Sequence, residues 1–123
     1  MPDVTFRDET ATGRLTDAFQ VAGLPARMTL RELIRLRVRE EVACHNADPS
    51  RAFTGLVRPR DAVPGGRRFV DWEKQADLAE RAFESNGFFV LSADRQLEDL
   101  DEEVDLTTDP ELTFIKLVPL VGG

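Results

Sequence analysis

The sequence has few of the residues on which most catalytic and metal sites are built. It contains one cysteine, Cys44, one histidine, His45, and no tyrosine among its 123 residues. A single cysteine excludes an internal disulfide framework and a cysteine-only metal site. With one histidine, tetrahedral zinc would need carboxylates alone as further ligands, and no Ser–His–Asp or Cys–His set can be argued. We therefore expect a protein that is not an enzyme and holds no metal or other cofactor.

Long apolar runs and a basic charge balance are also missing. No segment approaches the ~20 apolar residues of a membrane span, and no basic-then-apolar signal peptide opens the chain. The net charge of −7 argues against a general nucleic-acid binder, which needs a basic surface. Hydrophobic residues at 41%, with eight Phe, can supply one core. We expect a cytoplasmic protein of one domain.

The charge is distributed unevenly. Four arginines lie within residues 31–39, whereas residues 98–111 carry eight acids and no base. A basic helix beside an acidic loop could steer a partner toward the protein. The alternative is two solvated faces of opposite sign.

The first half of the chain predicts a hairpin followed by a helix. Val4 and Phe6 alternate with polar residues, a polar turn ends at Gly13, and residues 15–21 read as a second strand of uncertain register. Thr29 and Glu32 form a capping box, in which each side chain satisfies an exposed amide. The apolar stripe of this helix comprises Leu30, Leu33, Ile34, Val38 and Val42.

The second half predicts a loop over residues 46–69 and a helix from about Asp71 to Asn86, where Asn-Gly supplies a left-handed stop. Trp72, Ala76, Ala79 and Phe83 form its apolar stripe. A buried strand follows at residues 88–91, then an irregular acidic stretch over residues 95–105. Residues 113–118 read as a central strand, whose pairing should fade at Pro119.

This order of elements predicts an α+β domain of the β-grasp type. Its first and last strands would lie parallel within a mixed sheet, with the helix at about 29–45 across one face. The loop and second helix at about 46–87 would be an insertion. We expect one domain over residues 1–118 and a short tail over residues 119–123.

Two passages resemble ubiquitin. Asp94-Arg95-Gln96-Leu97-Glu98-Asp99 resembles the segment after its third strand, and Leu106-Thr107 through Val118-Pro119-Leu120-Val121-Gly122-Gly123 resembles its last strand and tail. The chain as a whole is similar to bacterial ubiquitin-like proteins of about this length. Val4 to Glu9, Thr29 to Ile34 and Phe114 to Gly123 carry this second resemblance.

The resemblance implies a protein modifier that acts with dedicated partners. In that bacterial group the partners are an activating enzyme, a conjugating enzyme and a deubiquitinase-like protease, encoded beside the modifier, and a role in antiviral defence is implied by resemblance only. ATP is used by the activating enzyme. The C-terminal carboxylate, here that of Gly123, is joined to target proteins through an isopeptide or an ester bond.

This chain departs from ubiquitin at two places. Arg95 replaces the loop lysine of ubiquitin, and a guanidinium is too basic to accept an acyl group. Pro119-Leu120-Val121 replaces a tail that contains two arginines. An activating enzyme that reads a basic tail should therefore reject this one.

A terminal Gly-Gly suits this chemistry. Gly122 and Gly123 have no Cβ, so their backbone can lie flat in a narrow channel, close to a nucleotide, and leave the carbonyl open to attack. Pro119, Leu120 and Val121 would be read together with them. A sulfur carrier, which forms a C-terminal thiocarboxylate, and a module that is never conjugated remain the alternatives.

Other surfaces could also take part. Leu117, Leu120 and Val121 could form an apolar partner-binding patch, unless Leu117 belongs to the core. Phe88, Phe89 and Trp72 are expected in the core. The chain has only two lysines, Lys74 and Lys116. Avoidance of self-modification and a codon bias toward arginine both explain this scarcity, and Lys74 is the better candidate acceptor.

Overall fold

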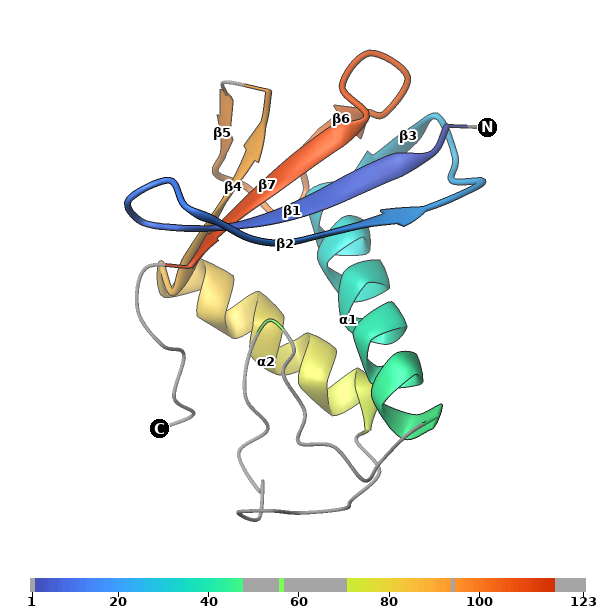
Figure 1. The fold of residues 1–123 in the computed structure, drawn as a ribbon, viewed down its shortest axis with the longest axis vertical. Coiled ribbons are helices and arrows are strands. Elements are labelled where there is room, and N and C mark those ends of the chain that lie inside the picture. Colours follow the sequence, from blue (N-terminus) through green and yellow to red (C-terminus); the bar gives the residue numbers. More distant parts are fainter. Residues whose placement is uncertain (1, 48–55, 57–70, 94, 117–123) are drawn as a thin grey trace.

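The computed structural model describes residues 2–47, 56, 71–93 and 95–116. Five strands form a mixed sheet in the order β2-β1-β7-β4-β5, and two further strands, β3 and β6, pair separately. Both helices lie on one side of the five-stranded sheet, with α1 running across that face (Figure 1). The expected α+β architecture with a mixed sheet and a helix across it is confirmed.

The hairpin forms from alternating residues, as predicted. β1 (Val4–Thr10) pairs antiparallel with β2 (Leu15–Val21), and Phe6 lies opposite Phe19. Val4, Phe6 and Asp8 are buried, whereas the residues between them are half-buried. The pairing of β1 with β2 shifts between Asp8 and Glu9, which explains why the sequence left the register of this hairpin uncertain.

Helix α1 (Leu30–Ala47) begins at the predicted capping box. The backbone N–H of Thr29 donates to Glu32 Oε1 at 3.0 Å, and the N–H of Glu32 donates to Thr29 Oγ1 at 3.2 Å. The helix runs two residues past its predicted end, so Asn46 and Ala47 are helical. All five residues of the predicted apolar stripe are buried.

Helix α2 (Trp72–Glu84) has Asp71 as its N-cap, and this carboxylate accepts from the N–H groups of Glu73 and Lys74. Asn86 adopts a φ of 60°, which is the predicted left-handed stop. Ala76, Ala79 and Phe83 are buried, but Trp72 is only half-buried.

The closing strands complete the sheet. β4 (Phe88–Ser92) and β7 (Glu111–Lys116) pair antiparallel, and β7 pairs parallel with β1, so that Asp8 lies opposite Phe114. The predicted last strand began at residue 113, whereas the observed one begins at Glu111.

The acidic stretch contains more regular structure than expected. β5 (Arg95–Leu97) pairs with β4, and β6 (Glu103–Asp105) pairs with β3 (Arg27–Thr29). The prediction of an irregular segment over residues 95–105 was therefore wrong in part. Strands of three residues are too short to show a clear period of two in sequence.

No helix among the described residues combines the length and apolarity that crossing a bilayer requires. The predicted loop over residues 46–69 falls mostly outside the described residues. Leu56, which belongs to it, is buried with 2% exposure.

Two hydroxyl deletions should have different effects on stability. Ser92 Oγ is buried without a hydrogen-bond partner among the described residues, so Ser92→Ala should leave the free energy of unfolding unchanged or raise it by up to ~1 kcal/mol. Thr29→Ala removes a helix cap and should lower the free energy of unfolding by about 1 kcal/mol. Urea unfolding measures both. A loss of stability in Ser92→Ala as large as that in Thr29→Ala would contradict this reading.

Candidate functional site

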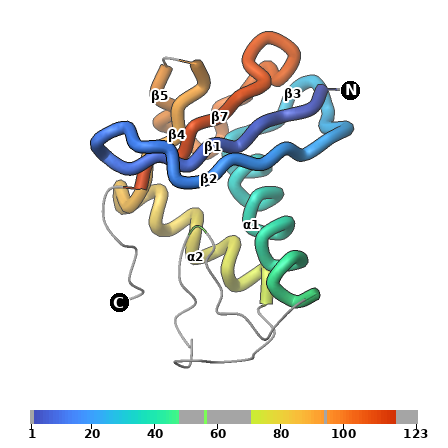
Figure 2. Tube along the Cα trace, in the orientation of Figure 1, coloured from blue at the N-terminus to red at the C-terminus, as the bar shows by residue number. Residues whose placement is uncertain are grey.

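The strand that precedes the predicted C-terminal tail lies in the middle of the sheet. Lys116, the last described residue, pairs with Thr10 of β1 on one side and with Phe88 of β4 on the other. In Figure 2 the end of β7 lies beside the start of β4 and the C-terminal end of α2. The predicted tail residues, Pro119, Leu120, Val121, Gly122 and Gly123, lie outside the described residues, as does Leu117.

A buried ion pair lies beneath this strand. Arg37 of α1 is 1% exposed and Asp8 of β1 is 4% exposed. Arg37 Nη2 donates to Asp8 Oδ2 at 2.6 Å, while Nη1 donates to Asp8 Oδ1, so the contact is bidentate. The guanidinium carbon lies 4.4 Å from the ring centroid of Phe114 and 5.6 Å from that of Phe19.

Two further charges complete the cluster. Arg37 Nε donates to Glu41 Oε1 at 3.2 Å, one helical turn along α1. Lys116 Nζ lies 3.8 Å from Asp8 Oδ2, which draws the last described residue of β7 toward the same carboxylate. Burial raises the pKa of the Glu41 carboxyl, although Arg37 and the backbone of Leu56 act in the opposite direction.

The arginine-rich part of α1 is largely matched by acids within the fold. Arg31 pairs with Glu80 and with Asp101, and Arg35 pairs with Asp77 at 3.0 Å and with Glu80. Arg39 lies over the ring of Trp72. These contacts join α1 to α2 at the surface. This helix is therefore not a free basic surface that could steer a partner, and it is not simply a solvated face.

The opposite face of the sheet carries a small apolar group. Phe89, Leu91 and Ile115 are half-buried, and Phe89 lies opposite Ile115 across the β4–β7 pair. We expected Phe88 and Phe89 both to be core residues, but only Phe88 is fully buried. Successive side chains of a strand point to opposite faces of a sheet, and this period of two would have placed Phe88 and Phe89 on different faces.

The remaining candidate residues lie apart from the end of β7. Lys74, the candidate acceptor, is exposed near the start of α2. Cys44 is an exposed free thiol on α1. Within the part of the chain that the structure describes, no group of three or more His, Cys, Asp or Glu is arranged to hold a metal ion.

Comparison of this chain with protein-family models, with curated protein sequences and with solved structures found no match.

The buried ion pair should be sensitive to removal of one partner only. Arg37→Met leaves Asp8 as a buried charge without its main partner and should lower the free energy of unfolding by about 3–5 kcal/mol. Arg39→Met, an exposed arginine on the same helix, should cost less than about 1 kcal/mol. The double variant Asp8→Leu/Arg37→Met should be more stable than Arg37→Met alone. If urea unfolding shows equal losses of stability in Arg37→Met and Arg39→Met, the assignment of Asp8 and Arg37 as a buried ion pair is contradicted.

Glu41 should leave a signature in the pH dependence of stability. Because its pKa is raised by folding, the folded chain holds this proton more tightly than the unfolded chain, so protonation of Glu41 favours the fold. This contribution is present below the ordinary value of 4.5 and is lost as the pH rises through the raised pKa.

The wild type should therefore gain stability relative to Glu41→Gln as the pH falls from neutral toward 4.5. Glu40→Gln, which changes an exposed neighbour, is the control and should show no such trend. A difference between wild type and Glu41→Gln that does not change with pH would refute the effect.

Proposed function

We propose that this chain is a ubiquitin-like protein modifier of β-grasp fold whose Gly123 carboxylate is activated and joined to target proteins. The observation that carries this function is the position of β7 in the fold. β7 pairs parallel with β1 in the middle of the mixed sheet, after a hairpin and a helix, and the sequence after it closes on Gly122-Gly123.

A carboxylate needs activation because its charge is delocalised and its oxygen is a poor leaving group. In the proposed route a dedicated activating enzyme transfers the adenylyl group of ATP to the Gly123 carboxylate and releases pyrophosphate. A cysteine thiolate of the enzyme then displaces AMP and forms a thioester. An amine or a hydroxyl of the target attacks this thioester and releases the thiolate.

The fold contributes a rigid base for this end of the chain. Lys116 is held by two neighbouring strands, and residues 117–123 can span at most about 25 Å beyond it, at ~3.5 Å per residue. The activating enzyme must therefore bring its nucleotide close to the sheet. Since Pro119, Leu120 and Val121 carry no charge, a partner that reads an apolar tail is required.

The half-buried group of Phe89, Leu91 and Ile115 supports a role in partner binding. Ile115 lies on the strand that leads to the tail, and an enzyme that accepts the tail can contact all three residues on the same face. Apolar residues that are partly exposed and gathered on one face can form an interaction surface. The activating and conjugating enzymes are the partners that we assign to it.

Deletion of Gly123 provides the direct test. The purified chain, ATP and the proposed activating enzyme should give a thioester adduct that a thiol reductant releases. The Gly123 deletion should lower the yield of this adduct at least about 100-fold, because the reactive carboxylate moves to Gly122. Lys74→Arg, a control outside the tail, should form the adduct at the wild-type rate.

Two outcomes would overturn this function. An adduct that forms equally well in the deletion variant would exclude activation at Gly123. A stable mass gain equal to one oxygen replaced by one sulfur, with no adduct on a target, would identify a sulfur carrier instead.

A further inference from the structure

A hollow opens on the surface where strand β5 ends before its neighbour does. β4 has five residues and β5 has three, so beyond Leu97 the chain leaves the sheet and crosses to the start of α1. There Leu100 O accepts from the N–H of Arg31 at 2.8 Å, and Glu102 O accepts from that of Leu30 at 2.9 Å. The end of α2 closes the remaining side, which leaves a hollow of about 450 Å³.

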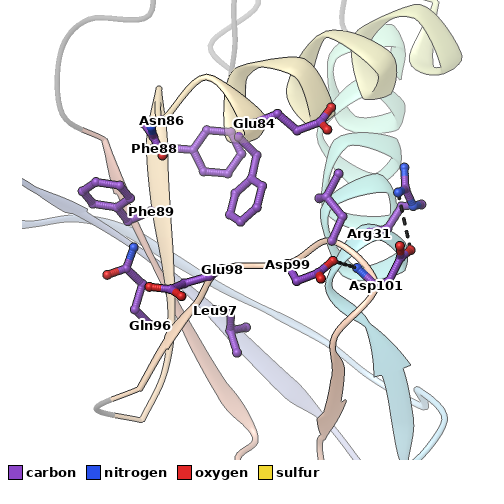
Figure 3. A pocket seen from close by; sticks show the side chains of 12 residues that line it. Arg31, Glu84, Asn86, Phe88, Phe89, Gln96, Leu97, Glu98, Asp99 and Asp101 are labelled. Atoms are coloured by element: carbon purple, nitrogen blue, oxygen red, sulfur yellow. Dashed lines mark hydrogen bonds and ion pairs between the residues drawn. The ribbon is translucent and has the colours of Figure 1, made fainter.

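The floor of the hollow is apolar. Phe83, Phe88, Leu97 and Leu100 line it and are buried in the core. Phe89 is half-buried and stands at one side, with the amides of Asn86 and Gln96 near it (Figure 3). Because the four residues of the floor are at most 8% exposed, the aliphatic stem of a long side chain or the face of a guanidinium would contact mainly Phe89.

The rim of the hollow is acidic. Among the described residues that line it, four carry carboxylates and one, Arg31, carries a positive charge, and the carboxylates belong to Glu84, Glu98, Asp99 and Asp101. Arg31 is already held by Glu80 and Asp101. Glu84 and Glu98 are exposed and have no ion-pair partner among the described residues, so their charges are available to an occupant.

The arrangement favours one kind of occupant. Nucleic acid and anionic lipid would be repelled by this rim. The carboxylates come from the end of α2 and from the segment after β5, and they surround the hollow instead of converging on one point, as the ligands of a metal ion would. An extended basic segment can place its charge at the rim and its apolar atoms against Phe89.

We propose that this hollow docks an arginine or lysine side chain, with an adjacent apolar residue, from a basic segment of a partner protein. Glu84 and Glu98 bind the cationic group, and Phe89 contacts its stem. Phe89 also belongs to the apolar group on the outer face of the sheet, so the partner can continue from the hollow onto that face. This docking does not depend on the chemistry of Gly123.

The test uses the full-length isotope-labelled chain and a short acetylated peptide in which two adjacent arginines are flanked by leucines. A matched peptide carries citrulline, which is neutral and nearly the same shape, in place of both arginines. Amide signals of residues around the hollow should shift on titration with the arginine peptide, and its affinity should exceed that of the citrulline peptide at least tenfold.

Two variants of equal net charge separate the hollow from general electrostatics. Glu84→Gln/Glu98→Gln should weaken binding of the arginine peptide at least tenfold. Glu40→Gln/Glu103→Gln, which removes two exposed acids away from the hollow, should weaken it less than twofold. Both variants should keep the wild-type amide spectrum outside their own surroundings.

Three results would overturn the docking site. The first is that the arginine peptide causes no shift around the hollow, and the second is that the two variants weaken its binding equally. The third is that spermidine or Mg²⁺, at equal charge concentration, causes the same shifts around the hollow as the peptide. Each would leave only a diffuse acidic surface. None of them bears on the thioester experiment, so the two functions stand or fall separately.

Discussion

The fold depends on one buried charge being neutralised where helix and sheet meet. Arg37 projects from α1 into the core and is held in a bidentate contact by Asp8, with Phe114 and Phe19 beside the guanidinium. A charge in this position is tolerated only while its partners stay in place. Because Asp8 lies opposite Phe114 in the parallel β1–β7 pair, the contact fixes the helix against these two strands, the second of which precedes the predicted tail.

Acids of the second helix also neutralise arginines of α1, but at the surface. Glu80 and Asp77 of α2 neutralise Arg31 and Arg35 of α1, so the two helices are joined by charges outside the core and by Ala76, Ala79 and Phe83 within it. Ion pairs that are partly exposed to solvent contribute little individually. Their effect is to set the position of the end of α2, which forms one wall of the acidic hollow. Helix α2 thus creates a surface that the sheet alone would not have.

The local features and the parallel pairing of the first and last strands were predictable from the sequence, whereas the buried ion pair and the hollow were not. The capping box at Thr29, the N-cap at Asp71 and the stop at Asn86 each depend on neighbouring residues, and each is observed. Arg37 had the charge expected of a solvated face, and its partner is 29 residues away, so nothing local marked it as buried. The hollow is lined by residues within 83–89 and 96–101 and by Arg31 of α1, and the way these segments meet depends on the tertiary fold. The tail was assigned from its chemistry and from resemblance, and stays a prediction.

The most direct measurement of the modifier hypothesis is mass spectrometry of proteins from cells that express this chain naturally with its neighbouring genes. Trypsin cleaves after Lys116, and no Lys or Arg follows it. A conjugated target should therefore yield branched peptides in which residues 117–123 remain attached through Gly123 to a lysine, serine or threonine. Finding these branches would support the account. Recovery of the chain only with a free terminal carboxylate, and no branched peptides under conditions in which the neighbouring genes are expressed, would contradict it.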